Sequence, residues 1–202
     1  IRIRNLSGRP RRVSVTGYVE WILGDLKSKT AMHVITETDT KTGALLARNS
    51  YNKEFKERIC FFYVNDLSRT ITTDRTEFIG LNASLKNPDA MGRVRLSGKT
   101  GAALDPCGAL QVVFELAENQ EHDIVFLLGT ADHHSAATTM VQRFRAPGAA
   151  GQALQAVRDY WKNTLQVMQF ETPDLALNLL GNGWLLYQTI ACRFFARSGF
   201  YQ

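Results

Sequence analysis

The residues best suited to acid–base chemistry in this sequence are two carboxylates, Asp74 and Glu77, set three positions apart. Paired carboxylates can divide the general-acid and general-base duties when their surroundings separate their pKa values. A carboxylate in such a position can also cap the first turn of a helix or stabilise a turn. Capping is the commoner use, so we expect a structural role and find no complete active site around the pair.

The segment Ser97–Thr100 reads Ser-Gly-Lys-Thr and is similar to the tail of a phosphate-binding P-loop. That motif needs glycine at position 93, where this chain has Arg93. The following Leu104-Asp105-Pro106 leaves no room for the helix that a P-loop requires. We interpret the segment as an ordinary glycine-containing loop.

The spacing of the other reactive side chains does not favour a metal site or a covalent nucleophile. These side chains are four histidines and three cysteines: His33, His122, His133, His134, Cys60, Cys107 and Cys192. They do not combine at a metal-ligand spacing, and no serine or cysteine has an evident partner base. Three distant cysteines also argue against a disulfide framework and for a reducing compartment. We expect no metal and no cofactor.

The net charge of +5 on these 202 residues comes from one end of the chain. Five arginines and no acids occupy the first twelve residues: Arg2, Arg4, Arg9, Arg11 and Arg12. The rest carries 19 basic and 19 acidic residues. We read the arginines as solvated residues of one short hairpin, with phosphate binding as the alternative, and expect no nucleic-acid partner. No leader and no run of about 18 uncharged apolar residues occurs, so we expect neither secretion nor a membrane span by this segment.

Strands must position these residues, because the pattern up to about residue 131 is one of short strands separated by turn signals. Many short strands without intervening helices predict an antiparallel β-sandwich. Ile59–Val64 is fully apolar, as expected for a strand covered on both faces. Asp39–Gly43 predicts a hairpin turn, with glycine where a positive φ is needed. Leu110–Leu116 and Ile124–Leu128 are expected to pair. We expect Phe78–Pro106, rich in Gly, Asn and Pro, to be a long, partly ordered loop with a function.

Helical patterns follow from Asp132 onward. Asp132 or Ser135 can cap a first helix, and the spacing of apolar residues predicts a second over 154–165. Thr172 is the expected N-cap of the last helical run, which is apolar nearly all round to residue 202. Such a helix is normally enclosed by neighbours. The chain therefore looks like part of a longer protein, ending where a helical domain begins.

Ordered motifs along nearly the whole chain resemble one family. They are Tyr18-Val-Glu-Trp-Ile-Leu-Gly24, Asp74-Arg-Thr-Glu-Phe-Ile-Gly80, Gly101-Ala-Ala-Leu-Asp-Pro-Cys107, Asn182-Gly-Trp-Leu-Leu-Tyr-Gln-Thr189, Cys192-Arg193 and Ala196-Arg-Ser-Gly-Phe-Tyr-Gln202. This set is similar to the cellobiose and chitobiose phosphorylase family, closest to its cyclic β-1,2-glucan synthase branch. The resemblance implies a mainly β plus α fold: an antiparallel, supersandwich-like β-sandwich (1–131), a helical linker (132–171) and the first helix of an (α/α)6 barrel (172–202).

The resemblance also implies a chemistry for the longer parent protein. Such enzymes cleave a β-glucosidic bond with inorganic phosphate as co-substrate and invert the anomeric centre. One aspartic acid protonates the leaving oxygen while phosphate attacks from the opposite face, so no second carboxylate is needed. In the family that acid lies deep in the barrel, which implies that this segment is non-catalytic and meets β-glucan through its parent. We expect a cytoplasmic segment; a homodimer and attachment of the parent to the bacterial inner membrane stay open.

Sandwich loops in the family can approach the barrel cleft, which makes several residues candidates for substrate binding. They are Arg75, Glu77, Asn82, Asp105, Arg197, Tyr201 and Gln202. The alternative is that such side chains hold a long loop by local hydrogen bonds. Trp184 and Tyr187 can stack on a sugar, although we expect them to be core residues. The family typically has arginine where this chain has Leu81, which weakens the expected contact there.

Two other functions remain open. A free-standing carbohydrate-binding module would present an exposed aromatic platform, whereas Trp21, Phe61, Phe62 and Phe126 all lie in apolar strand contexts. A structural sandwich in an unrelated membrane enzyme would require the resemblance near the end of the chain to be coincidental. We favour the non-catalytic sandwich and linker of a β-glucan-active enzyme.

Overall fold

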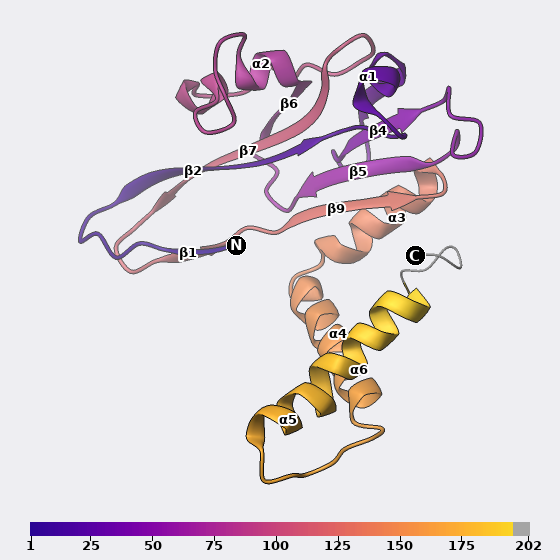
Figure 1. Cartoon of the computed structure of the whole chain (residues 1–202). Helices are drawn as coiled ribbons and strands as arrows, with labels where there is room; N and C mark the ends of the chain where they lie inside the picture. The colour runs from indigo at the N-terminus through magenta and orange to yellow at the C-terminus, as the bar shows by residue number, and fades with distance from the viewer. Residues whose placement is uncertain (196–202) are drawn as a thin grey trace. The chain divides into compact units, whose positions relative to one another are not determined.

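The computed structural model describes residues 1–195, and its strands form three antiparallel sheets (Figure 1). Their orders are β3-β4-β5-β9, β2-β7-β6 and β1-β8. The strands are β1 (Arg2–Arg4), β2 (Arg11–Glu20), β3 (Val34–Thr38), β4 (Leu45–Asn49), β5 (Ile59–Val64), β6 (Thr70–Asp74), β7 (Pro106–Leu116), β8 (Glu121–Asp123) and β9 (Phe126–Ala131). The chain divides into two units, Ile1–Ala146 and Pro147–Gln202.

Helices complete both units. In the first unit they are α1 (Lys27–Thr30), α2 (Arg75–Ile79) and α3 (His134–Arg145), with 3-10 turns η1 (Ala31–His33) and η2 (Asp89–Gly92). In the second they are α4 (Ala149–Leu165), α5 (Leu175–Leu179) and α6 (Leu185–Ile190), with π-helical segments η3 (Leu180–Trp184) and η4 (Ala191–Phe195). The helix predicted over 154–165 is confirmed by α4.

The first unit is layered around two sheets. Strand β5 shows this best, because its alternate residues face opposite sides. Phe62 joins the core between the sheets with Leu110 of β7, while Phe61 packs on the other side with Val141 of α3. Leu110 and Val141 are fully buried, and burial of one such side chain stabilises the fold by about 2 kcal/mol. The predicted β-sandwich is confirmed, as is a β5 strand covered on both faces.

A third apolar cluster lies on the outer face of the other sheet. There Phe78 and Ile79 of α2 pack against Cys107 and Ala109 of β7. Figure 1 shows α3 and α2 on opposite sides of the sheets. The four rings predicted to point inward agree with this, because Trp21, Phe61 and Phe62 are buried and Phe126 is partly buried against the core. The sandwich thus places α2 and the loop after it at one outer face.

The predicted hairpin turn is confirmed. It links β3 to β4, and Gly43 has φ of 69°. Asp39 stabilises the turn by accepting hydrogen bonds from the backbone N–H of Thr42 (3.0 Å) and Lys41 (3.5 Å).

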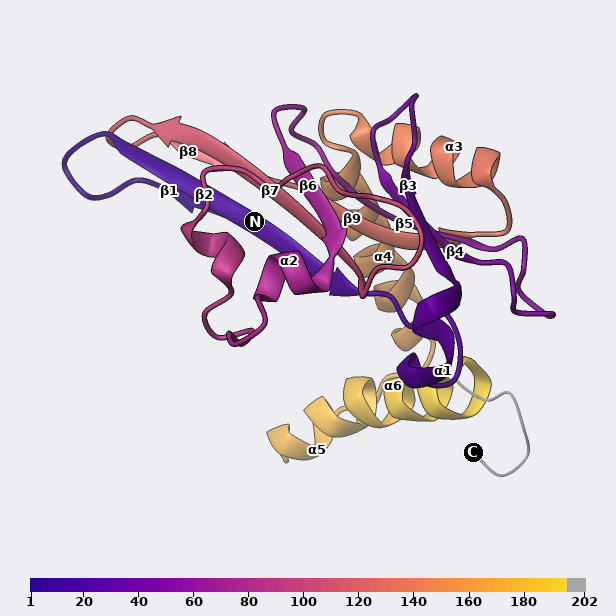
Figure 2. The same ribbon diagram turned by 90° about the horizontal axis from the view of Figure 1, so that it is seen from above.

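Two predicted strand pairings are wrong. Strands β7 and β9 lie in different sheets, β7 between β2 and β6 and β9 beside β5. Figure 2 shows β2 alongside β7 over the length of both strands. The five N-terminal arginines do not share one hairpin either, since β1 pairs with β8 and β2 with β7. Apolar alternation reports which face of a strand is buried but does not name its neighbour.

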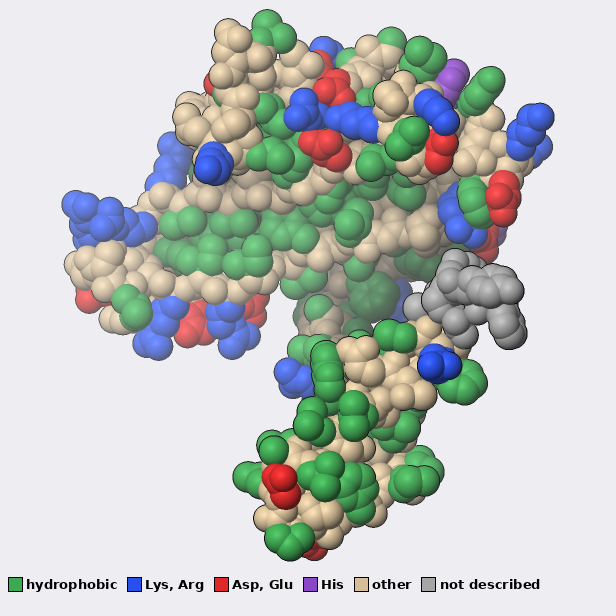
Figure 3. All heavy atoms as spheres, viewed as in Figure 1, with side chains coloured by type: hydrophobic (Ala, Val, Ile, Leu, Met, Phe, Trp, Pro, Cys, Tyr) green, Lys and Arg blue, Asp and Glu red, His purple; other side chains and the backbone are tan. Residues whose placement is uncertain are grey.

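The N-terminal arginines are all exposed, as predicted. Arg2 forms an ion pair with Asp123 at 2.8 Å, and Arg4 lies 3.8 Å from Glu121. Figure 3 shows Lys and Arg side chains gathered at the end of the β1–β2 connection, at the left of the view. Solvent screens such exposed pairs, so they add little to the stability of the fold.

Both predicted helix caps need correction. The cap of α3 is His133, whose Nδ1 accepts from the N–H of Ala136 at 3.2 Å, rather than Asp132 or Ser135. The cap of α5 is Asp174, whose Oδ1 accepts from the N–H groups of Ala176 (2.8 Å) and Leu177 (3.3 Å). Thr172 instead donates to Asn178 Oδ1 at 2.7 Å. A carboxylate that reaches two free N–H groups outcompetes a hydroxyl placed two residues earlier.

The last helices of the second unit are apolar nearly all round, and none of their described residues is buried. Trp184 is 55% exposed. Tyr187 packs edge-on against Trp161 of α4, with ring centroids 4.9 Å apart. Only part of the core environment predicted for Trp184 and Tyr187 is therefore present among the described residues of this unit.

Candidate functional site

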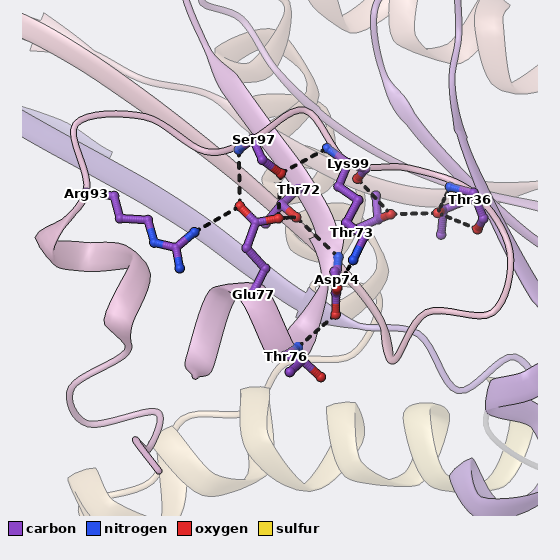
Figure 4. A network of polar contacts seen from close by, with 10 residues as sticks. Thr36, Thr72, Thr73, Asp74, Thr76, Glu77, Arg93, Ser97 and Lys99 are labelled. Carbon is purple, nitrogen blue, oxygen red and sulfur yellow. Dashed lines mark hydrogen bonds and ion pairs between the residues drawn. The ribbon is translucent and has the colours of Figure 1, made fainter. Parts of the chain in front are cut away.

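The candidate site surrounds α2 and the long loop from residue 80 to 105. Asp74 ends β6 and caps α2, because its Oδ1 accepts from the Thr76 N–H at 3.0 Å. Its other oxygen receives the Lys99 ammonium at 2.5 Å (Figure 4). Burial alone would raise the pKa of Asp74, but hydrogen bonds from Lys99 and Thr76 hold it below its ordinary value. The predicted capping role is confirmed, and the P-loop-like lysine binds a carboxylate of its own chain.

Glu77 lies one turn further along α2 and holds the far side of the loop. One oxygen accepts from the Ser97 N–H at 3.1 Å and faces Arg93 at 3.4 Å. The other accepts from the hydroxyls of Thr72 and Ser97, each at 2.6 Å (Figure 4). Burial would raise the pKa of Glu77, and the hydrogen bonds from Ser97 and Thr72 outweigh it and lower that pKa. Both oxygens are satisfied within the fold.

A third anchor fixes the loop to strand β3. The Thr73 hydroxyl lies 2.7 Å from that of Thr36 and donates to the backbone carbonyl of Lys99 at 3.0 Å. Thr36 and Gly101 exchange hydrogen bonds through the Thr36 hydroxyl, at 3.0 and 3.1 Å (Figure 4). Thr36 and Thr73 are both buried, so these bonds are shielded from competing water.

Arg75 and Asp105 belong to a closed ring of four alternating charges. Arg75 binds Glu20 at 2.8 Å and Asp105 at 3.4 Å. Lys27 binds the same two carboxylates at 3.0 Å each. Burial would raise the pKa of Glu20, but hydrogen bonds from Arg75, Lys27 and Tyr18 lower it to about 2. The ring therefore links four places in the fold: the end of β2, the start of α1, the start of α2 and the residue before β7.

An open, polar pocket of about 870 Å³ lies between α2 and the first part of the loop. Its lining is rich in amide, hydroxyl and carboxylate groups and includes Glu77, Asn82, Asn87, Asp89 and Arg93. Groups of this kind suit a ligand that carries many hydroxyls. Leu81, which stands where the resemblance leads us to expect arginine, is 87% exposed on the pocket's lining.

The predicted site residues fall into three sets. Glu77 and Asn82 line the pocket, and Arg75 and Asp105 meet in the charge ring. The other three, Arg197, Tyr201 and Gln202, lie outside the described residues. Binding of substrate by any of the seven stays a prediction.

Sequence reasoning missed four other residues here. Asn87 and Asp89 share the pocket, and Glu20 and Lys27 complete the ring. The segment from Asn82 to Asp89, in which polar residues outnumber apolar ones, was a signal for the first two. No local signal joins Glu20 to Arg75, since 55 positions separate them.

Residues 1–195 show no sign of a metal site, a proton-donating carboxylate or a membrane-spanning helix. No group of three or more His, Cys, Asp or Glu side chains is placed to hold a metal ion in this part of the chain. Each carboxylate there whose pKa clearly departs from its ordinary value has that pKa lowered; they are Glu20, Asp25, Asp39, Asp74, Glu77 and Asp123. No helix within the described range combines the length and apolarity needed to cross a bilayer.

Comparison with known proteins identifies the family. Residues 1–147 match the family model of the glycosyl hydrolase 94 supersandwich domain. The chain belongs to this family. The chain is also similar to the cyclic beta-(1,2)-glucan synthase NdvB of Rhizobium meliloti (strain 1021), with 36% identity over all of this chain but 7% of that protein.

Two phosphorylases are more distant relatives of this supersandwich chain. The N,N'-diacetylchitobiose phosphorylase of Vibrio furnissii is 24% identical over 98% of this chain and 25% of its own length. The cellobionic acid phosphorylase of Neurospora crassa is 25% identical over 92% of this chain and 24% of its own length. The chain therefore spans at most about a quarter of these three relatives. The resemblance inferred from the motifs is confirmed, while the (α/α)6 barrel and the domain boundaries stay predictions.

Proposed function

We propose that this chain is the non-catalytic supersandwich and linker part of an enzyme that acts on β-glucans by inverting phosphorolysis. Its relatives by name include a β-(1,2)-glucan synthase and two phosphorylases, which supports this substrate and reaction class. The observation that carries the non-catalytic role is the occupancy of the site's own carboxylates. Both oxygens of Glu77 and both of Asp74 accept hydrogen bonds from neighbouring groups of the fold, and these bonds lower the pKa of each carboxylate.

Inverting phosphorolysis needs one acid that still holds its proton at the working pH. That acid protonates the leaving glucosyl oxygen while phosphate, already a nucleophile, attacks the opposite face. A raised pKa suits an acid to this task. Glu77 and Asp74 have the opposite shift and give their oxygens to Ser97, Thr72 and Lys99. Such carboxylates position a loop and do not donate protons.

In this proposal the pocket beside α2 contacts the sugar hydroxyls of the glucan. Asn82 and Asp89 are exposed and line it, whereas Glu77, Arg75 and Asp105 hold the surrounding loops in shape. Phosphate is the co-substrate of the parent enzyme's catalytic centre, and we propose no metal and no other cofactor. We also propose that the parent enzyme is a homodimer, that it works in the reducing cytoplasm and that it has no nucleic-acid partner.

The test is phosphorolysis by the longer protein that contains this chain. Given β-1,2-glucan and inorganic phosphate, it should release α-glucose 1-phosphate, and the 202-residue chain alone should release none. Asn82→Ala in the longer protein should raise KM for glucan with kcat little changed, and Lys86→Ala, at an exposed position outside the pocket lining, is the matched control. Release by the chain alone would overturn the non-catalytic role. The absence of product from the folded longer protein would overturn the proposed reaction.

A further inference from the structure

A second concave surface lies on the first unit around α1 and the loop between β4 and β5. Two pockets, of about 330 and 510 Å³, adjoin there. Both are lined by Gly24, Asp25, Asn49 and Asn52, and we call the continuous depression the α1 trough. Figures 1 and 2 both show α1 beside β4. None of these lining residues belongs to the pocket beside α2.

The backbone of the trough is held in an uncommon conformation. Leu23 has φ of 46°, in the left-handed region that non-glycine residues seldom adopt. The buried side chain of Asn49 donates to the Leu23 carbonyl at 3.0 Å and so fixes it. Gly24 lies against Thr30 so closely that a Cβ would collide with the Thr30 side chain. Strain that the surroundings enforce is concentrated at functional sites in proteins, which makes this surface worth testing.

Each end of the trough presents an aromatic ring supported from one side. Tyr51 is 74% exposed and stacks on His33, with ring centroids 4.1 Å apart and planes 11° apart. Phe55 is 43% exposed, and the Arg58 guanidinium lies 4.7 Å from its centroid. Rings steadied in this way keep their exposed area available at low entropic cost. The apolar CH face of a pyranose stacks on such surfaces.

Several charges of the trough have partners of opposite sign. Asp25 binds Lys29 at 3.0 Å, and Arg58 lies 3.5 Å from Asp132. Asn52 uses its Oδ1 to accept from the backbone N–H groups of Glu54 and Phe55, which leaves its amide N–H₂ directed to other acceptors. Lys53 also lines the trough and is exposed. Apart from this cation the surface consists of rings, amides and paired charges, which favours a neutral, hydroxyl-rich ligand.

We propose that the α1 trough is an auxiliary subsite for a neutral β-glucan chain, with Tyr51 and Phe55 as stacking platforms and Asn52 as a donor to sugar oxygens. The proposal rests on the proposed function for the choice of β-glucan. Separate from the pocket beside α2, the trough would tether a polymer and raise its effective concentration at the parent's catalytic centre. Short substrates that cannot reach both places would gain nothing.

Calorimetry on the 202-residue chain with linear β-1,2-glucan oligosaccharides tests binding. Tyr51→Ala should weaken the affinity about five- to tenfold, the loss of one stacking contact, and Tyr51→Phe should retain it. Asn52→Asp keeps both backbone contacts and removes the amide donor, so it should also weaken binding. Leu85→Ala, exposed and outside the trough, is the matched control. No heat from the folded wild-type chain, or equal affinity in Tyr51→Ala, would overturn the subsite.

Kinetics of the longer protein separate failure of the subsite from failure of the proposed function. Tyr51→Ala should raise KM for long glucan about five- to tenfold, with kcat and the KM of a disaccharide unchanged. Phosphorolysis with equal KM values for wild type and variant overturns only the subsite. No phosphorolysis, with binding intact in calorimetry, overturns only the reaction. Titrations with inorganic phosphate, cello-oligosaccharides and malto-oligosaccharides test the ligand class; tighter binding of phosphate or of the malto series than of β-1,2-glucan would refute it.

Discussion

Glu77 offers the sharpest test of how the loop beside α2 is held. Glu77→Ala removes an acceptor for the Thr72 hydroxyl and for both the N–H and hydroxyl of Ser97. The side chain is 11% exposed, so water replaces these bonds poorly. At about 1 kcal/mol for each bond, the variant should lose about 3 kcal/mol. The exposed contact with Arg93 adds little.

Hydrogen exchange measured by mass spectrometry on peptides from residues 70–105 reports this loss locally. Local opening should become about 100-fold more frequent in Glu77→Ala, while peptides from β5 and β9 should change little. Glu118→Ala, an exposed glutamate on the turn after β7, is the control and should match the wild type. Exchange in Glu77→Ala within threefold of the wild type, roughly 0.6 kcal/mol, would refute the anchoring role.

The pH dependence of the same residue has a definite sign. The pKa of Glu77 is lower in the folded chain than its ordinary value of 4.5. Its stabilising contribution is therefore complete above pH of about 4.5 and is lost as the pH falls through the folded pKa. Glu77→Gln keeps one carbonyl acceptor and loses the charge, so it should cost about 1 kcal/mol at neutral pH. The difference between wild type and Glu77→Gln should vanish in acid; a constant difference across this range would contradict the assignment.

Three further outcomes follow from the contacts of single residues. Glu20, whose pKa is about 2, should stabilise the fold above pH 4.5 and lose this effect toward pH 2, so Glu20→Gln should flatten the acid limb of a thermal unfolding curve. Leu81→Arg should lower KM for β-glucan in the longer protein, whereas Leu85→Arg, exposed but outside the pocket lining, should not. Gly17→Ala places a Cβ within 3 Å of two core phenylalanine rings and should lower the unfolding free energy by about 1–3 kcal/mol. Gly151→Ala, whose Cβ meets no neighbour in α4, should raise the unfolding free energy by about 1 kcal/mol. Thermal unfolding followed by calorimetry compares the two variants.

The sequence predicted elements and faces better than it predicted neighbours. The apolar run Ile59–Val64 correctly indicated a strand covered on both faces, and Gly43 correctly marked a turn. Both signals are local, because they depend on side-chain alternation and on one residue's backbone freedom. The pairing of β7 with β2 and β6 joins segments up to about a hundred positions apart, and no periodicity encodes that choice.

The candidate site shows the same limit at the level of single residues. The cap formed by Asp74 was predictable, since a short acidic residue before a helix has few other uses. The ring that joins Glu20 to Arg75 and Asp105 was not, because ion pairs between β2, α2 and the start of β7 exist only once the sheet is assembled. His133 was missed as a cap because histidine is an uncommon choice, and its Nδ1 serves here as the acceptor.

Residues whose hydrogen-bonding capacity is already used within the fold differ from residues whose polar groups are free to bind a ligand. Glu77 has both oxygens occupied and Arg75 lies in a closed ring, so a sugar could bind them only by breaking bonds already made. Asn82 and Asp89 face the pocket without that cost. Replacing a saturated residue should therefore loosen the loop and change local exchange as well as KM, whereas Asn82→Ala should change KM alone. If Asn82→Ala also accelerated exchange across residues 80–105, the division between building and binding residues would be wrong.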